Sequence, residues 1–298
     1  MSFSMEVKNE LAEQMSRSRH CQLAELSALI SHEAGLCVRD GKTVLRFESE
    51  NPIVQKKYFT LLNKTTSIFE DGLSLVQEDA KEVLTTVKMW KETDVGPQIC
   101  MDVVDGLLLQ QTCCKRAFIR GAFLASGSIS DPTKSYHFEI VCKSRAQAVQ
   151  MQEIMTSFEV DAKIVERKRH YVVYLKEGAQ IVDMLNVMGA HVALMNLENV
   201  RILKEMRNSV NRKVNCETAN ISKTVSAAVR QVEDIRYIEQ NMGLSSLPDH
   251  LREIAEIRLA HPDMPLKDLG QMLSPPLGKS GVNHRLRHIS EIADRHRV

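Results

Sequence analysis

A cluster of basic and amide side chains lies near the C-terminus, in the segment 279–288. Its members can donate or accept hydrogen bonds at a phosphate or a base edge: Lys279, Ser280, Asn283, His284, Arg285, Arg287 and His288. Asparagine and arginine carry paired groups that match adenine and guanine edges in the major groove, and lysine and arginine bind phosphates. No Asp or Glu occurs between Asp268 and Glu291, so these cations meet an approaching phosphate unopposed. The segment therefore predicts a surface that binds double-stranded DNA.

The apolar residues of the same segment predict the helix that carries this surface. Val282, Leu286 and Ile289 recur at i, i+4 and i+7, the spacing of a buried helical face. Ser280 is placed to cap the N-terminus of the helix. Asn283 and its polar neighbours are then left pointing outward. The alternative is an ordinary amphipathic terminal helix with a solvated basic face.

Two further helices are expected just before this one. Leu266, Leu269 and the pair Met272–Leu273 fall on one helical face, and Pro275–Pro276 with Gly278 end that helix. The segment 247–259 has the pattern of a third helix. Three short helices of which the last is basic are typical of a helix-turn-helix domain, whose last helix enters the major groove.

A long polar segment, 195–240, precedes these helices. It has a helical rhythm without proline or glycine, and Gly243 is the expected helix end. We predict two helices joined near Cys216–Asn220, because asparagine favours caps and turns. The polar side of the segment supplies three more candidates for contacts with phosphates or bases: Arg207, Arg212 and Asn215.

The composition of the whole chain excludes several classes of protein. With 298 residues and 43% hydrophobic side chains, the chain is long enough for two or three packed domains. The net charge of +1 says nothing about partners, because local patches set the field that a nucleic acid meets. Apolar runs are short and the N-terminal segment carries acids, so we expect no membrane span and no signal peptide. We expect a cytoplasmic protein, as the cysteine usage described next also indicates.

The seven cysteines include no CxxC pair. An odd count without paired spacing predicts a reducing compartment and argues against a disulfide framework or a structural zinc site. We interpret the adjacent Cys113 and Cys114 as small buried apolar residues. His284 and His288 are spaced i, i+4, but no cysteine accompanies them, so contact with DNA or solvent is expected. No cofactor, metal site or small-molecule substrate is predicted.

The first two-thirds of the chain repeats itself weakly. Two glycines that follow helical patterns, Gly35 and Gly127, lie 92 residues apart, and Phe47 and Phe138 lie 91 apart. The expected helices run from about 20 to Gly35, over 52–69, up to Gly127, over 145–158 and from 179. The expected strands are 36–40, 43–49, 73–79, 82–90, 136–142, 161–168 and 170–176. This order predicts two α+β halves that pack about a pseudo-dyad. Duplication of a stable module would account for the repeat, so the repeat by itself does not indicate a function.

The end of the second repeat helix resembles a known motif. FIRGAFLASGS, residues 118–128, resembles the LAGLIDADG motif of homing endonucleases, and ELSALISHEAG resembles it more faintly. The resemblance implies two central helices packed through small residues, here Gly121 and Ala125, under a saddle of sheets that grips DNA. Enzymes of that family place a carboxylate just before the motif glycine to hold Mg²⁺, which prefers oxygen ligands and activates water.

The carboxylates of that family are missing here at the matching positions. Ala34 and Ser126 stand where the acids belong. Glu33 is one residue off, which rotates its side chain by about 100° on a helix. Asp131 lies in an Asp-Pro-x-Lys turn signature. We therefore interpret this half as a LAGLIDADG scaffold without the cutting machinery.

Three longer segments resemble the WhiA family of Gram-positive bacteria. They are RNSVNRKVNCETANISKTVSAAVRQ, LPDHLREIAEIRLAHPDMPLKDLGQML and PPLGKSGVNHRLRHI. The resemblance covers nearly the whole chain and implies a catalytically silent LAGLIDADG-like domain tethered to a helix-turn-helix similar to sigma-factor region four. It further implies a transcriptional regulator of sporulation or cell division, or a factor in chromosome segregation.

Together these patterns predict an α+β two-repeat LAGLIDADG-like saddle followed by an all-α helix-turn-helix domain. The predicted segments are two repeats at 1–95 and 96–195, a helical connector at 196–243 and the DNA-binding domain at 244–298. The predicted function is non-enzymatic, sequence-specific DNA binding at the nucleoid, with another transcription factor or RNA polymerase as a candidate partner.

Two alternative functions stay open at this stage. One is a Mg²⁺-dependent endonuclease that uses displaced acids such as Glu33 and Asp131. The other is an interaction scaffold whose sheets present the segments 136–139 and 167–170 to a protein partner.

Overall fold

The computed structural model describes residues 2–39, 41–68, 73–94 and 96–297. The chain divides into an N-terminal unit, Met1–Glu205, and a C-terminal unit, Met206–Val298. Each unit has its own hydrophobic core. The four segments predicted from the sequence stay a prediction.

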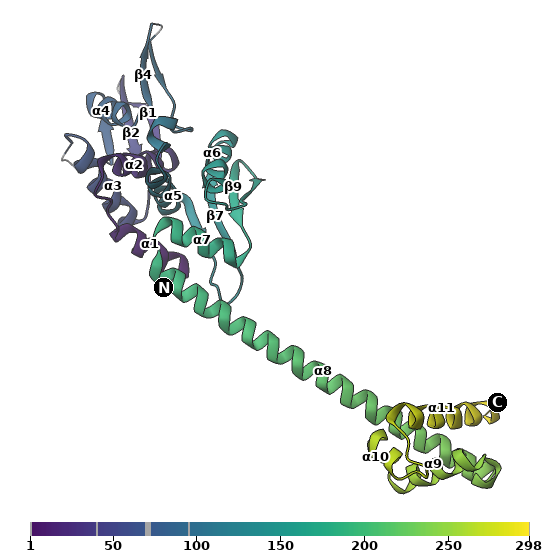
Figure 1. The fold of residues 1–298 in the computed structure, drawn as a ribbon. Helices are drawn as coiled ribbons and strands as arrows, with labels where there is room; N and C mark the ends of the chain where they lie inside the picture. Colours follow the sequence, from purple (N-terminus) through teal and green to yellow (C-terminus); the bar gives the residue numbers. More distant parts are fainter. Residues whose placement is uncertain (1, 40, 69–72, 95, 298) are drawn as a thin grey trace. The chain divides into compact units, whose positions relative to one another are not determined.

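Two helices form the centre of the N-terminal unit. α2 (Arg19–Glu33) and α5 (Thr112–Ser126) lie side by side (Figure 1), and most of their residues are buried. Gly121 makes this contact possible: a Cβ at that position would lie 2.5 Å from the Glu25 carbonyl oxygen and 2.9 Å from the Ala28 Cβ. The backbones of α2 and α5 therefore touch, as the resemblance to LAGLIDADG proteins implies. Ala125 is buried as well.

The second repeat forms a complete four-stranded antiparallel sheet. Its strand order is β6 (Gly127–Ile129), β7 (Phe138–Cys142), β9 (His170–Leu175) and β8 (Lys163–Arg167). Buried side chains alternate with partly exposed ones along β7, which is the pattern of a sheet with one solvated face. Helices α6 (Arg145–Thr156) and α7 (Gly178–Met188) accompany the sheet. The predicted strands and helices of this repeat are confirmed.

The first repeat is less regular. It contains a three-stranded sheet in the order β1 (Ala34–Arg39), β2 (Lys42–Phe47) and β3 (Ser74–Val76), together with helices α1 (Phe3–Glu13) and α3 (Pro52–Thr65). The predicted ends of one strand at Asp40 and of one helix at Phe69 lie outside the described residues. α3 itself ends at Thr65.

The strand predicted over 82–90 is wrong. That segment begins in helix α4 (Glu78–Thr86), which buries Ala80, Val83 and Leu84 at helical spacing. A separate hairpin of β4 (Trp90–Thr93) and β5 (Gly96–Ile99) follows. A short 3₁₀ turn over Gly106–Leu109 then leads into α5.

The two glycines that were expected to close the central helices behave differently. α2 ends at Glu33 with Ala34 already extended, so Gly35 lies inside β1 and does not close the helix. Gly127 does follow the end of α5, in an extended conformation. A Cβ on Gly127 would lie 2.3 Å from the Phe123 ring, so the glycine is needed for space.

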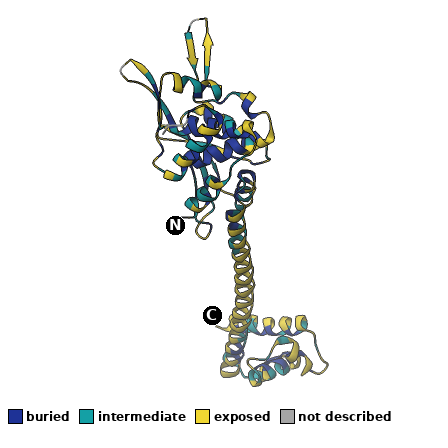
Figure 2. Ribbon diagram, turned by 90° about the vertical axis from the view of Figure 1, so that its left-hand side faces the viewer, coloured by how far each residue is buried: buried dark blue, intermediate teal, exposed yellow. Residues whose placement is uncertain are grey.

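The long polar segment forms one uninterrupted helix, α8 (His191–Asn241), of 51 residues. The predicted junction near Cys216–Asn220 is wrong, because Asn220 keeps its place in the helix and its carbonyl accepts from the Thr224 hydroxyl at 2.9 Å. Near its start, Ala193 and Leu197 belong to the N-terminal core. Between Glu205 and Ser226 every residue of α8 is exposed (Figure 2). No helix in the described residues is long and apolar enough to cross a membrane.

The C-terminal unit packs three short helices onto the end of α8. They are α9 (Asp249–Ala260), α10 (Leu266–Gln271) and α11 (Lys279–His296). Ile235 and Ile238 of α8 share their core. Leu269 and Leu273 are buried as predicted, but Met272 is 47% exposed. Of the predicted pair Met272–Leu273, only Leu273 joins the core, because α10 ends at Gln271 and the chain turns there.

Candidate nucleic-acid interface

Helix α11 carries the cluster of polar residues near the C-terminus. Its inward side is formed by Val282, Leu286 and Ile289, all at most 1% exposed, as their spacing predicts. The helix begins at Lys279 with Gly278 as the extended N-cap residue, whose carbonyl accepts from the Val282 N–H. The prediction of Ser280 as the N-cap is therefore wrong. Ser280 lies in the first turn with an exposed side chain.

Six polar residues form one continuous face of α11. All are exposed, and their spacing of one, three and four residues places them along one side of the helix: Lys279, Ser280, Asn283, His284, Arg287 and His288. We call this set the α11 polar face. Nearly three helical turns, at about 3.6 residues per turn, therefore offer donors to an approaching anion before the first carboxylate, at Glu291.

Arg285 lies at the edge of this face. It is half-buried, and its Nη1 donates to the carbonyl oxygen of His250 in α9 at 3.1 Å. One of its donors thus holds α11 against α9, and the others stay available to a ligand.

The sequence predicts that no acid opposes the cations of the α11 polar face, and within the described residues the structure agrees except at Arg287. α11 has no acid in its first turn, so the partial positive charge of the helix N-terminus is uncompensated there. Arg287, however, lies with its Nε 3.5 Å from Glu291 Oε1, so it is not unopposed. The two side chains are 79% and 51% exposed. Exposed ion pairs of this kind contribute little to stability, so Arg287 can exchange the Glu291 carboxylate for a phosphate at little cost.

Two buried features hold the helices of the C-terminal unit in place, and sequence reasoning missed both. Arg258, only 3% exposed, donates from Nε and Nη2 to Gln231 Oε1 at 3.1 and 2.8 Å, and from Nη1 to the Met264 carbonyl at 2.7 Å. The Leu277 N–H donates to the Gly270 carbonyl at 2.9 Å and closes the turn between α10 and α11. A basic residue in an amphipathic helix gives no sequence signal that it is buried.

The three candidates on α8 are exposed. Arg207, Arg212 and Asn215 all lie on the solvated stretch of the helix. Within the described chain, no hydrogen bond or ion pair joins any of them to α11. Their side chains are accessible to solvent, but they are not assembled with the α11 polar face.

At the ends of α2 and α5, the positions where the homing endonucleases carry their acids hold Ala34 and Ser126. Ser126 donates its hydroxyl proton to the Val141 carbonyl at 2.7 Å, and its Oγ lies 2.8 Å from His32 Nδ1. Burial raises the pKa of Glu33, while Lys8 and Lys143 oppose that rise. A second carboxylate, Glu48, adds to the rise, so Glu33 lies among both cations and an anion, and neither Ala34 nor Ser126 adds a carboxylate oxygen of the kind that Mg²⁺ prefers.

The other displaced acid, Asp131, serves a turn. Its Oδ1 accepts from the Thr133 backbone N–H at 2.8 Å and from the Thr133 hydroxyl at 2.6 Å. These hydrogen bonds lower the pKa of Asp131. The turn predicted from the sequence is confirmed.

The solvated face of the four-stranded sheet is the surface that the alternative scaffold function would use. Several of its polar side chains are joined in a network of hydrogen bonds around Glu139. Glu139 Oε2 accepts from His137 Nε2 at 2.9 Å and from Arg167 Nη1 at 3.1 Å, and its Oε1 accepts from the Ser128 hydroxyl. Phe138 is fully buried and stacks on Phe123, so it is not part of the surface.

His32 gives the N-terminal unit a predicted pH dependence. Burial lowers the pKa of His32 from 6.5 to about 4. Between pH 6.5 and about pH 4 the unfolded chain therefore binds one more proton at His32 than the folded chain does. The stability that neutral His32 allows is complete above pH 6.5 and is lost as the pH falls toward 4. The free energy of unfolding should drop by about 3 kcal/mol through this group. Urea unfolding at several pH values should show a flatter profile for His32→Gln; equal slopes would contradict the assignment.

Fold and site together define a class of protein: a helix-turn-helix DNA-binding regulator joined to a degenerate LAGLIDADG-like domain. Residues 210–293 match the WhiA C-terminal HTH domain, and residues 115–207 match the WhiA LAGLIDADG-like domain. The chain belongs to the WhiA family.

Full-length relatives support this membership. The "Probable cell division protein WhiA" of Lachnoclostridium phytofermentans is 51% identical, over 99% of this chain and 99% of that protein. The protein of the same name from Alkaliphilus metalliredigens is 45% identical, over 100% of this chain and 99% of that protein. Among solved structures, full-length DUF199/WhiA from Thermatoga maritima has a similar fold, with a TM-score of 0.58 at 24% identity over 99% of both chains.

Proposed function

We propose that this protein is a non-enzymatic, sequence-specific transcriptional regulator that reads DNA with the α11 polar face. The observation that carries the proposal is the α11 polar face itself. Six exposed polar side chains, with no acid among them, lie along one side of a helix whose opposite side is buried in the core of the C-terminal unit. Helix-turn-helix proteins place such a face in the major groove.

The roles within this face follow from side-chain chemistry. Asn283 and Arg287 have the paired groups that recognise adenine and guanine edges, and His284 and His288 lie beside them. Lys279 and Ser280, with the free N–H groups of the first turn, suit a phosphate at the helix N-terminus. Contacts with phosphates set position and affinity, while contacts with bases set specificity. Arg207, Arg212 and Asn215 would add phosphate contacts from α8.

The biological role proposed for the protein comes from its relatives. Several of them are named as cell division proteins. We propose that this chain acts in cell division, chromosome segregation or sporulation, at the nucleoid in the cytoplasm. A second transcription factor or RNA polymerase is its candidate partner.

Arg287→Ala tests the assignment of α11. Loss of a base contact should weaken specific binding by about 1–3 kcal/mol and blur the preference at one position of the site. If Arg287 contacts only a phosphate, affinity should fall equally for all sequences, and the salt dependence should become shallower by about one ion. Fluorescence anisotropy on selected genomic fragments, at several salt concentrations, distinguishes these results.

Arg252→Ala is the matched control. Arg252 lies on α9 and forms an exposed ion pair with Asp249, so the substitution removes the same charge from the same unit. If both variants bind DNA like the parent, α11 is not the reading helix. Supercoiled plasmid incubated with the full chain and Mg²⁺ or Mn²⁺ should stay uncut; nicking that requires the metal would restore the endonuclease alternative.

A further inference from the structure

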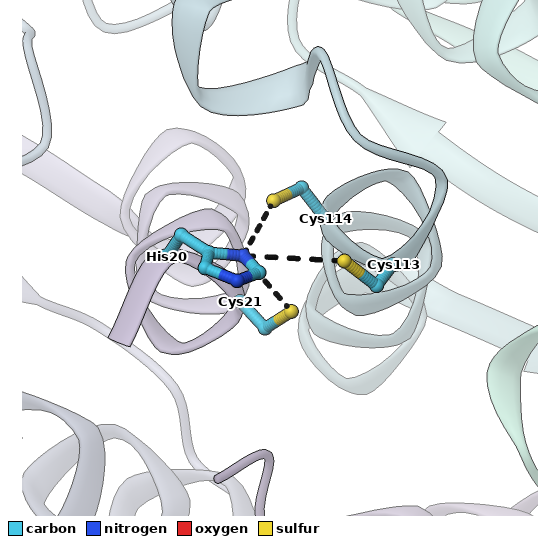
Figure 3. Close-up of side chains that lie close together, drawn as sticks. All are labelled: His20, Cys21, Cys113 and Cys114. Atoms are coloured by element: carbon cyan, nitrogen blue, oxygen red, sulfur yellow. Dashed lines mark hydrogen bonds between the residues drawn. The ribbon is translucent and has the colours of Figure 1, made fainter. Parts of the chain in front are cut away.

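Four potential metal ligands meet at the N-terminal ends of the two central helices. His20 and Cys21 come from the first turn of α2, and Cys113 and Cys114 come from the first turn of α5. Figure 3 shows the four side chains pointing toward one another across the gap between the helices. Their ligand atoms all lie within 4.8 Å of one another, and within the described residues this is the one group of His, Cys, Asp and Glu that converges so closely.

The spacing of these atoms suits a tetrahedral zinc ion. His20 Nδ1 lies 3.1 Å from Cys114 Sγ, 3.3 Å from Cys21 Sγ and 4.0 Å from Cys113 Sγ. Zn–S and Zn–N bonds of tetrahedral sites place a nitrogen and a sulfur ligand about 3.5 Å apart. The three distances bracket that value, so small rotations of the side chains would suffice. We propose that His20, Cys21, Cys113 and Cys114 form a structural Zn²⁺ site that links α2 to α5.

The ligand set favours zinc among the common metal ions. Three soft thiolates and an imidazole, which also suits zinc, select this ion over Mg²⁺ or Ca²⁺. Four protein ligands leave no open position for water or substrate, so the site is structural rather than catalytic. His20 and Cys113 are exposed, which gives the ion a path from solvent, while Cys21 and Cys114 are buried and fix the inner side.

The two helix ends supply electrostatic support for the bound ion. Neither α2 nor α5 has an acid in its first turn, and within the described chain neither N-cap side chain bonds a backbone N–H. Both positive helix ends are therefore uncompensated. A zinc ion with three thiolates and a neutral imidazole carries one net negative charge, which two helix N-termini stabilise.

The three cysteines bind the ion as thiolates. Zinc binding replaces the three thiol protons, which leave to solvent, with three Zn–S bonds.

The position of the cysteines in the repeat indicates what the site does. Cys21 and Cys113 are 92 residues apart, the same interval that separates Gly35 from Gly127. They are equivalent residues of the two repeats, so the ion would bridge the pseudo-dyad and close a long loop of chain. The cluster escapes a sequence search because its ligands form two adjacent pairs and no CxxC spacing.

Metal binding to the reduced full-length chain tests the proposal. After removal of metal with a chelator, cobalt titration should give one equivalent per chain, with a thiolate-to-cobalt charge-transfer band and the intense visible bands of tetrahedral cobalt. Zinc should displace the cobalt and raise the thermal midpoint of Trp90 fluorescence, the only tryptophan signal of the chain. Cys113→Ser and His20→Ala replace exposed ligands, so the fold should survive while both effects are lost.

Two exposed cysteines outside the cluster provide the controls. Cys37→Ser and Cys216→Ser should bind cobalt and zinc like the parent chain. Equal zinc content in the parent and in Cys113→Ser would overturn the site. So would a metal-free protein, isolated without air, in which Cys21 and Cys113 are joined as a disulfide. The proposal does not depend on DNA recognition, because these measurements contain no DNA.

Discussion

Glu25→Ala is expected to lower the free energy of unfolding of the N-terminal unit by about 3–5 kcal/mol. Glu25 is fully buried in α2 between two cations. Its Oε1 lies 3.1 Å from Lys57 Nζ, and its two oxygens accept from Arg120 Nε and Nη2 at 3.0 and 2.8 Å. Removal of the carboxylate leaves an ammonium and a guanidinium buried without a counter-charge, which is far more costly than the loss of an exposed pair.

The network around Glu25 limits how the protein can adapt. Burial lowers the pKa of Lys57, while Glu25 opposes that change, so Lys57 can relieve part of the penalty by losing its proton. Arg120 cannot do so, because a guanidinium keeps its charge. It retains hydrogen bonds to the Ser16 hydroxyl at 2.9 Å, the Met188 carbonyl at 3.4 Å and Gln14 Oε1 at 3.5 Å, and these neutral acceptors do not replace a carboxylate.

Urea unfolding of the full-length chain can measure this loss without interference from the C-terminal unit. Trp90 is the only tryptophan and packs against the N-terminal core, so its fluorescence reports on that unit. Glu48→Ala is the control, because Glu48 forms an exposed pair with Arg46 and should cost less than about 0.5 kcal/mol. Similar losses for both variants would show that the buried pairs contribute no more than a surface pair.

The regular parts of the fold could be predicted because local pattern and burial agree there. The strands of the second repeat alternate β-branched and polar residues, and the structure pairs them as one sheet. In the segment 82–90, the β-branched residues Val83, Thr85, Thr86 and Val87 favour a strand. Packing of Ala80, Val83 and Leu84 on one side decides for a helix instead. Tertiary burial overrides local propensity there, and the sequence alone does not reveal it.

In the candidate sites too, features set by local periodicity could be predicted, and contacts between distant segments could not. The α11 polar face could be predicted because helical periodicity alone separates it from Val282, Leu286 and Ile289. The role of Arg285 could not, since its partner is a carbonyl of another helix, 35 residues away. Cys113 was interpreted as buried, but it is exposed and faces His20 across two helices. Contacts between distant segments leave no periodic signal.

Gly270→Ala is expected to destabilise the helix-turn-helix by about 3 kcal/mol and to weaken specific DNA binding more than about tenfold. A Cβ at Gly270 would lie 2.1 Å from the Leu277 carbonyl oxygen and 3.0 Å from Val282 Cγ2. The turn must therefore move away from α10, and α11 begins only two residues after Leu277. The α11 polar face is then displaced from the helices that hold it in place.

Gly281→Ala is the matched control with the opposite sign. Gly281 lies inside α11, and a Cβ there meets only Leu277 side-chain atoms at 3.6–3.7 Å, an ordinary contact. Alanine should stabilise that helix by roughly 0.5–1 kcal/mol, because glycine is the poorer helix former. Helix propensity favours alanine at Gly270 as well, so a loss of stability there can come only from the close approach of the Leu277 carbonyl. Circular dichroism during urea unfolding gives both changes. If Gly270→Ala gains stability as Gly281→Ala does, that close approach does not constrain the turn, and the position of α11 must depend on other contacts.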